Sequence, residues 1–289
     1  MRVWRAVWGN GLHFPAVPDP SPAAPPPTRL LDLPTHRMMR RRVAIYGGAF
    51  DPPTNGHFSC CSEIIHSGLA DEVWITPCGP RPDKPRMIGS AIDRMLMCQL
   101  GVNTVYTPTF PVRVCDIETY EEESLATFDT LCRLRQKHAD VDFLFVVGSD
   151  WLQPGTDLRT WESRDPADPT GKGRIVTGDK LVTEFDFLVL HRPGYDIEDL
   201  SAFGPRFNML TMAGGMKFVT TDISSTQLRK RMGNSLHIRE AIGSNEVNLD
   251  LVDGLMPPAV LSFILRSGVY NQKAVQEARR RSIAAGATG

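Results

Sequence analysis

Short apolar runs alternate with segments of helical periodicity along most of this chain. The apolar runs predict buried strands at residues 43–47, 73–77, 112–117, 142–148, 185–191 and 216–220. The periodic segments predict helices at 55–67, 90–100, 125–138, 225–232 and 257–267. Strands that alternate with helices form βαβ units with right-handed crossovers. The pattern therefore predicts an α/β fold, a Rossmann-like doubly wound parallel sheet in a single domain.

The two ends of the chain lack this pattern. Prolines are dense between Pro15 and Pro34, and the segment has neither a helical nor a strand period. We therefore predict a disordered, proline-rich N-terminal extension over residues 1–42, a folded domain over 43–271 and a flexible C-terminal tail over 272–289.

Composition excludes several classes of protein. The 32 basic and 33 acidic residues give a formal charge of −1, so general binding to nucleic acid or to a membrane is not expected. No apolar run approaches the ~20 residues that span a bilayer. The six cysteines have no metal-binding spacing and are predicted to be free thiols in a reducing compartment, cytoplasmic or nuclear. The alternative is mitochondrial targeting through the N-terminal extension, which carries arginines and few acids.

The first candidate site follows the strand at 43–47. Gly47 and Gly48 let backbone N–H groups approach an anion closely, and the next helix presents the partial positive charge of its N-terminus. His57 lies in the first turn of that helix, where it can donate a hydrogen bond to a phosphate oxygen. By itself, Gly-Gly after a strand favours the simpler interpretation of a tight βα turn. The longer string from Gly47 to His57, with Phe50-Asp51-Pro52-Pro53 inside it, is more specific and predicts a phosphate site.

The second candidate site is the segment Asp222-Ile223-Ser224-Ser225-Thr226-Gln227-Leu228-Arg229. Its hydroxyl residues gather at the start of a predicted helix, where they can cap it and leave N–H groups for an anion. Arg229 lies one turn later on the same helix face, within reach of the same phosphates. Taken alone, the segment is equally typical of a capped surface helix.

Together, the two segments resemble the (His/Thr)-x-Gly-His and Ile-Ser-Ser-Thr-x-x-Arg motifs of the nucleotidylyltransferase superfamily. The narrower resemblance is to the nicotinate/nicotinamide mononucleotide adenylyltransferases. Further segments similar to that family are Asp83-Lys84-Pro85-Arg86, Asp93-Arg94-Met95-Leu96-Met97, Asp116-Ile117-Glu118, Thr127-Phe128-Asp129-Thr130-Leu131, Gly148-Ser149-Asp150, Thr160-Trp161-Glu162 and His191-Arg192-Pro193-Gly194-Tyr195. The resemblance covers residues 43–271, which it identifies as a nucleotidyltransferase domain.

The resemblance implies an enzyme that transfers AMP from ATP to the 5′-phosphate of a pyridine mononucleotide and releases pyrophosphate, with Mg²⁺ on the ATP phosphates. It implies His57 and Arg229 as catalytic residues. The residues expected to bind ATP are Gly48, Ala49, Phe50, His57, Gly148, Asp150, Ser225, Thr226 and Arg229. Those expected to bind the mononucleotide are Gly48, Ala49, Lys84, Thr127, Thr130, Trp161 and Arg192. No protein side chain is expected to be a metal ligand.

The chain departs from the family pattern at a few positions. Thr54 stands at the first position of the His-x-x-His pair, and Ala126 replaces an aromatic residue. Extra residues at 165–180 and 242–254 are expected to lengthen polar surface loops.

Other interpretations stay open at this point. Trp161 can be a packing residue, Lys84 a solvated loop residue and Asp150 a helix N-cap, while Arg94 can pair with Asp93 or Glu63. Alternative functions are a nucleotidyltransferase for phosphopantetheine or glycerol phosphate, and a non-catalytic nucleotide-binding or chaperone-like module. The sequence decides neither between nicotinate and nicotinamide mononucleotide nor between a monomer and a homo-oligomer.

Overall fold

Six strands of the described residues form a sheet at the centre of the fold. The computed structural model describes residues 40–81, 87–212, 223–232 and 251–270. Neighbouring strands are all parallel, in the order β3-β2-β1-β4-β7-β8. Their bounds are β1 (Arg41–Gly48), β2 (Glu72–Pro77), β3 (Val112–Val114), β4 (Val141–Gly148), β7 (Asp186–Leu190) and β8 (Phe207–Met209). The order corresponds to a doubly wound, Rossmann-like sheet, which confirms the predicted fold class.

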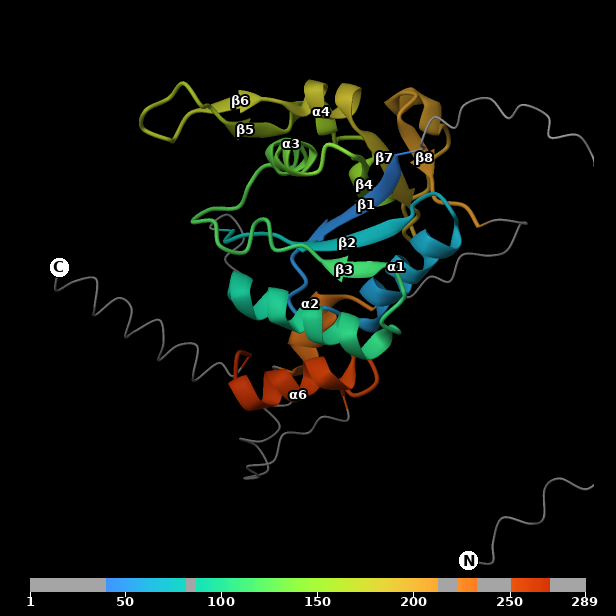
Figure 1. Cartoon of the computed structure of the whole chain (residues 1–289), viewed down its shortest axis with the longest axis vertical. Coiled ribbons are helices and arrows are strands. Elements are labelled where there is room, and N and C mark those ends of the chain that lie inside the picture. The colour runs from blue at the N-terminus through green and yellow to red at the C-terminus, as the bar shows by residue number, and fades with distance from the viewer. Residues whose placement is uncertain (1–39, 82–86, 213–222, 233–250, 271–289) are drawn as a thin grey trace, which may run out of the picture. The chain divides into compact units, whose positions relative to one another are not determined.

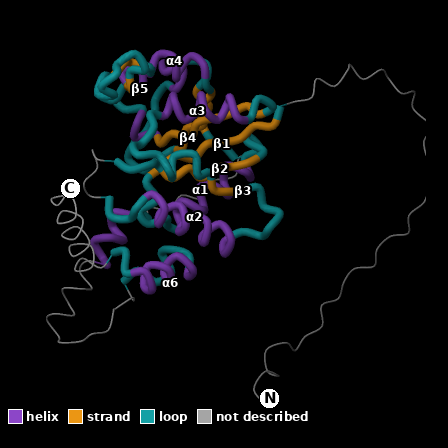
Figure 2. Tube along the Cα trace, turned by 60° about the vertical axis from the view of Figure 1, so that its left-hand side comes forward, coloured by secondary structure: helices purple, strands orange, loops and turns teal. Residues whose placement is uncertain are grey.

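Helices cover both faces of this sheet (Figures 1 and 2). One face carries α3 (Thr127–Lys137) and α4 (Gly178–Glu184). The other face carries α1 (Asn55–His66) and α2 (Ala91–Val105), and α6 (Pro258–Ser267) packs against α2. The predicted helix at 225–232 is also present.

The central strand β1 is buried on both faces, as its apolar run predicts. Val43 and Ile45 belong to the hydrophobic cluster beneath α3 and α4. Ala44 and Tyr46 belong to the cluster beneath α1 and α2. Because side chains alternate along a strand, one continuous apolar run supplies both layers and leaves the carboxyl end of β1 open for chemistry.

Local signals in the sequence fix where helices begin and end. Thr54 and Ser90 start α1 and α2 with capping boxes, whose N3 partners are His57 and Asp93. At the end of α6, Gly268 takes the left-handed conformation (φ 65°) that glycine adopts without strain.

The structure departs from the predicted elements in several places. The third strand ends at Val114 rather than at residue 117, and α2 continues to Val105. Two further strands, β5 (Glu162–Arg164) and β6 (Arg174–Val176), form an antiparallel pair. The polar loop predicted at 165–180 is therefore wrong in part, because that range includes β6 and the start of α4. The edge strand β8 was not predicted, and the strand predicted at 216–220 lies outside the described residues.

All six cysteines are free, as expected. Within the part of the chain that the structure describes, no helix combines the length and apolar character that crossing a bilayer requires.

Candidate active site

The candidate site lies where the strand order reverses. The chain builds β1, β2 and β3 outward in one direction and then returns to place β4 on the other side of β1. Loops that leave the carboxyl ends of β1 and β4 separate there and form a crevice, the usual ligand position in such sheets. Gly48 ends β1 and Gly148 ends β4, so both predicted glycines lie at this crevice.

The loop after β1 is shaped by Phe50. This residue has a positive φ of 49°, which is unusual for a side chain of its size. Its ring covers Gly48 so closely that a Cβ at Gly48 would lie 3.1 Å from it, and it makes edge contacts with Tyr46 and His57 at centroid distances of 5.5 and 5.0 Å. The ring is almost fully buried, so Phe50 is a wedge that holds the loop, and its contribution to a ligand site comes from its backbone.

His57 is held in one tautomer by the cap of α1. The backbone N–H of Thr54 donates to Nδ1 of His57 over 2.9 Å. An Nδ1 that accepts this bond carries no proton, so the neutral ring bears its proton on Nε2. Burial, together with the positive charge of Arg192, lowers the pKa of His57 to about 4. At neutral pH, therefore, His57 offers a single N–H donor at Nε2.

The second predicted segment docks directly on the first. The hydroxyl of Thr54 donates to the carbonyl of Ile223 over 3.2 Å, and the hydroxyl of Ser225 donates to the carbonyl of Pro52 over 2.7 Å. Arg229 donates to the carbonyl of Asp51 and lies 3.7 Å from its carboxylate. The two motifs, about 170 positions apart, are thus brought together as predicted.

This docking engages the side chain of Ser225, so any contact of this residue with a phosphate falls to its backbone N–H. Its hydroxyl proton is already used in the bond to Pro52, so the side chain cannot also donate it to a phosphate. The cap at the start of this helix is Ser224, whose hydroxyl accepts from the N–H of Gln227 over 3.2 Å. Thr226 lies beside Arg229, with its oxygen 3.2 Å from Nη2.

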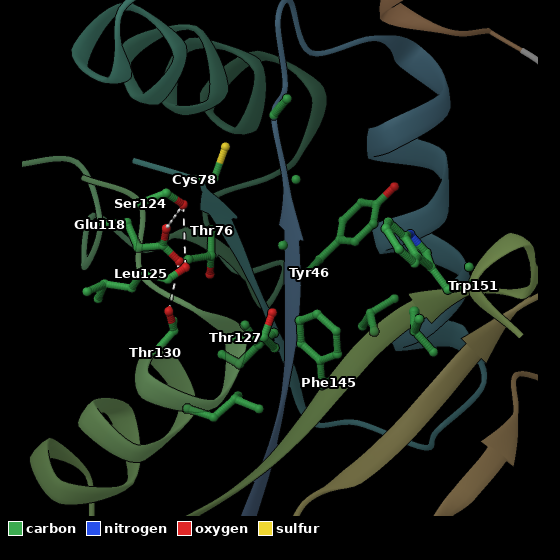
Figure 3. A pocket seen from close by; sticks show the side chains of 18 of the residues that line it. Tyr46, Thr76, Cys78, Glu118, Ser124, Leu125, Thr127, Thr130, Phe145 and Trp151 are labelled. Carbon is green, nitrogen blue, oxygen red and sulfur yellow. Dashed lines mark hydrogen bonds between the residues drawn. The ribbon is translucent and has the colours of Figure 1, made fainter. Parts of the chain in front are cut away.

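A pocket of about 200 Å³ opens on the other side of the β1 loop (Figure 3). Its floor is formed by the ends of β1 and β4, and its walls by the segment before α3 and by two tryptophans. The residues that line it include Gly48, Ala49, Thr76, Arg81, Glu118, Ser124, Thr127, Thr130, Gly148, Trp151, Trp161 and Arg192. The structure thus gathers most of the residues predicted to bind a mononucleotide into one cavity.

One pocket wall is organised by the buried carboxylate of Glu118. It accepts hydrogen bonds from the Thr130 hydroxyl at 2.9 Å and from the Ser124 hydroxyl at 3.3 Å (Figure 3). It also accepts from the N–H of Gly79 at 3.0 Å. The Thr130 hydroxyl donates its proton to Glu118 and so helps to hold this wall, while Thr130 also lines the pocket as a predicted mononucleotide-binding residue. Thr127, in contrast, begins α3, whose N-cap Ala126 makes no side-chain cap.

The opposite wall carries aromatic and charged groups. Trp151 and Trp161 meet edge to face with their centroids 5.2 Å apart. Asp150 and Arg192 form an ion pair at 3.2 Å that folds back over Gly148. The Asp150 Oδ1 atom of that pair is buried and makes no hydrogen bond of good geometry among the described residues, so it has acceptor capacity left for a ligand hydroxyl.

Some functional residues were missed from the sequence, and one was misjudged. Trp151 and Arg81 line the pocket but were not predicted to bind a ligand. The available signal for Trp151 was an aromatic residue directly after a strand-end Gly-Ser-Asp. Arg94 pairs with neither Asp93 nor Glu63 on the surface, because its side chain is fully buried. Lys84 lies outside the described residues.

The buried guanidinium of Arg94 ties together the loops around the pocket. It donates to the carbonyls of Ala49 (2.8 Å), Cys78 (2.6 Å), Gly79 (3.1 Å) and Gly89 (3.1 Å). These acceptors belong to the loops that follow β1 and β2. Arg94 therefore fixes the floor of the site relative to its wall, without facing a ligand itself.

Comparison with known proteins agrees with this site. The model of the cytidylyltransferase-like family matches residues 45–231. A probable nicotinate-nucleotide adenylyltransferase of Halalkalibacterium halodurans is 32% identical over 193 residues, which cover 66% of this chain and 80% of the relative. The nicotinate-nucleotide adenylyltransferase of Bacillus subtilis is 24% identical over 235 residues, with 80% of this chain and 98% of the relative covered.

A solved structure shares the fold. It is the Plasmodium falciparum nicotinic acid mononucleotide adenylyltransferase complexed with NaAD, with a TM-score of 0.58 at 23% identity, covering 80% of this chain and 98% of that one.

The fold and the paired phosphate motifs define a nucleotidyltransferase. The chain belongs to the cytidylyltransferase-like family, and within it to the nicotinate/nicotinamide mononucleotide adenylyltransferases. It is an adenylyltransferase that transfers AMP from ATP to a pyridine mononucleotide, which confirms the enzyme class and function expected from its sequence.

Proposed function

We propose that this enzyme prefers nicotinate over nicotinamide mononucleotide and so forms deamido-NAD. The observation that carries the proposal is the positive character of the pocket wall around Thr127. The N-terminus of α3 has no side-chain cap, and Arg81 lines the same cavity. The N–H groups of a helix start without a side-chain cap and a guanidinium both favour a carboxylate over a neutral amide.

The state of Glu118 supports the same preference. An acid in the pocket would repel nicotinate if its charge faced the ring. Here three donors, from Gly79, Ser124 and Thr130, already surround that carboxylate. Its negative charge is therefore compensated by the wall rather than directed at the ligand. The names of the curated relatives, nicotinate-nucleotide adenylyltransferases, agree with this choice.

The pocket and the strand end at Gly148 each suit a different part of the two substrates. We assign the pyridine ring to the pocket beside Trp161, and the nicotinate carboxylate to the wall at Thr127 and Arg81. Gly48 and Ala49 form the floor that the two substrates share, and Lys84 is assigned to the mononucleotide phosphate. The ATP ribose is assigned to the strand end at Gly148 and Asp150, whose carboxylate suits a pair of hydroxyls.

The ATP phosphates are assigned to the junction of the two motifs. We place the α-phosphate at Nε2 of His57 and the β- and γ-phosphates at Thr226, Arg229 and the N–H groups that start the 225–232 helix. Arg192 lies near enough to His57 to lower its pKa, so it adds positive charge on the mononucleotide side.

The proposed reaction is a direct displacement at the α-phosphorus. An oxygen of the mononucleotide phosphate forms a bond to that phosphorus, and the bond to the bridging oxygen of pyrophosphate breaks. The attacking phosphate carries a charge of about −1.5 to −2 at pH 7, so no general base is required. His57 donates its Nε2 hydrogen bond to the oxygen on which charge develops, and Arg229 neutralises the departing pyrophosphate.

Mg²⁺ is proposed to arrive with ATP. The described residues contain no group of three or more His, Cys, Asp or Glu side chains that could hold a metal ion. An ion coordinated by phosphate oxygens and water fits that donor set, because Mg²⁺ retains several waters when it binds substrate phosphates. Its contribution would be to neutralise charge on the triphosphate.

A competition of acceptors tests the preference. The purified enzyme, ATP and Mg²⁺ are incubated with each mononucleotide separately, and dinucleotide and pyrophosphate are measured. We expect kcat/KM for nicotinate mononucleotide to exceed that for nicotinamide mononucleotide by at least about tenfold, the discrimination worth one charge-assisted hydrogen bond. Arg81→Gln should reduce this ratio mainly through KM for nicotinate mononucleotide. The control is Arg113→Gln, which removes an exposed arginine on β3 that pairs with Glu72. Equal efficiency with both acceptors would contradict the proposed preference.

A further inference from the structure

The buried carboxylate of Asp51 joins separate parts of the chain at the edge of the site. Its side chain is completely buried. Oδ2 accepts from the N–H of Ile88 over 2.8 Å, and Oδ1 accepts from the N–H of Gly89 over 2.9 Å. Oδ1 also accepts from the hydroxyl of Tyr270 over 2.6 Å. The segment before α2 and the segment after α6 therefore meet on one acid.

The same acid holds Arg229. The guanidinium lies 3.7 Å from Asp51 Oδ2, and its Nη1 also donates to the Asp51 carbonyl. Its Nη2 donates to Thr226 over 3.2 Å. The arginine is only 19% exposed, so its position is set largely by these contacts. Any rotation of the Asp51 carboxylate changes the attraction that the guanidinium experiences.

Tyr270 is a suitable anchor for that carboxylate. It packs in the cluster formed by α2, the 225–232 helix and α6, with Met97, Leu228 and Val260 among its members. Burial and the nearby Asp51 charge raise the pKa of Tyr270, so the hydroxyl keeps its proton and acts as a donor. A rigid, buried ring delivers that donor with little rotational freedom.

We propose that Tyr270 is a positioning residue for AMP transfer: its hydroxyl fixes the Asp51 carboxylate, which in turn holds Arg229 toward the ATP phosphates. The inference rests on the role proposed above for Arg229. When the hydroxyl is removed, Asp51 keeps its charge but loses one of three hydrogen bonds. The less restrained carboxylate can then rotate, so it no longer holds the guanidinium in the orientation that faces the phosphates.

The test compares two conservative variants. Tyr270→Phe removes the hydroxyl on Asp51. Tyr106→Phe removes a hydroxyl that donates to the Phe58 carbonyl over 2.5 Å, in the packing between α1 and the segment after α2. We expect Tyr270→Phe to raise KM for ATP, and KM for pyrophosphate in the reverse reaction, by about tenfold, the scale of one hydrogen bond to a charged group. KM for the mononucleotide should stay unchanged, and Tyr106→Phe should alter none of the three.

A double-mutant cycle with Arg229→Ala identifies the route of the effect. If Tyr270 acts through Arg229, adding Tyr270→Phe to Arg229→Ala changes KM for ATP no further. Additive effects, or an unchanged KM for ATP in Tyr270→Phe, would overturn the inference. An Arg229→Ala enzyme with an unchanged KM for ATP would instead overturn the proposed role of Arg229.

Asp51→Asn is the second variant should Tyr270→Phe fold poorly. It removes the charge beside Arg229 and should also raise KM for ATP alone, and an unchanged value would refute the proposal.

Discussion

Replacing His57 with alanine separates its structural contribution from its catalytic one. The side chain has two roles: Nδ1 accepts a hydrogen bond from the Thr54 N–H at the start of α1, and Nε2–H is the proposed donor to the α-phosphate. Loss of the cap costs about 1 kcal/mol. In a domain of this size that lowers Tm by about 2–4 °C, so the enzyme stays folded at assay temperature. Loss of one positioned donor to a developing charge lowers kcat by about 10²–10³-fold.

The assay measures pyrophosphate release with saturating ATP and nicotinate mononucleotide, alongside thermal unfolding. Asp93→Ala is the matched control, because Asp93 is the N3 partner of Ser90 in the capping box of α2. Both variants should lose similar stability, and only His57→Ala should lose turnover. A kcat for His57→Ala within about threefold of the parent enzyme, or an equal loss in both variants, would refute the reasoning.

The lowered pKa of His57 makes the free energy of unfolding depend on pH. Folding lowers this pKa from 6.5 to about 4, so the unfolded chain binds a proton in that window and the folded chain does not. The stability contributed by the neutral ring is therefore complete above pH 6.5 and is lost as the pH falls toward 4. Because the ring is partly exposed, we expect a loss of about 1–2 kcal/mol. Urea unfolding of the parent should follow this pH dependence, and His57→Ala should lack it.

Two further variants test the framework around the site. Arg94→Met leaves four loop carbonyls without their donor and should cost about 3–5 kcal/mol of unfolding free energy; a loss below about 1 kcal/mol in urea unfolding would contradict the role of this buried charge. Gly148→Ala places a Cβ 2.2 Å from Asp150 Oδ1 and 2.7 Å from Arg192 Nε, so the ion pair must move and KM for ATP should rise severalfold, whereas an unchanged KM would remove Asp150 from the ATP site.

The central strands could be predicted from the sequence because burial on both faces produces long apolar runs. β1, β4 and β7 are such strands. The short strands β5, β6 and β8 have three residues each, and their exposure ranges from fully exposed in β6 to mixed in β8. No periodicity can be established over so few positions, so tertiary contacts decide their conformation.

The phosphate motifs could also be predicted, because their chemistry is local. Glycines, a helix start and His57 follow one another directly in the chain. The particular hydrogen bonds between distant segments could not be predicted. The acceptors of Arg94 are backbone carbonyls. Because every residue type has a carbonyl, the sequence does not show which of them accept. The hydroxyl of Ser225 donates to the carbonyl of Pro52, a bond that depends on a docking that only the folded chain reveals.

The Tyr270–Asp51 contact spans 219 positions, and it makes the phosphate site one of the last parts of the molecule that can form. During synthesis, the six strands that the structure describes in the central sheet have all been made by Met209, before either Arg229 or Tyr270 exists. A nascent chain at that stage can pair its strands but lacks the residues that hold the triphosphate. The fold thus couples catalytic competence to completion of the domain, and a ribosome-bound fragment with an assembled sheet should not yet consume ATP.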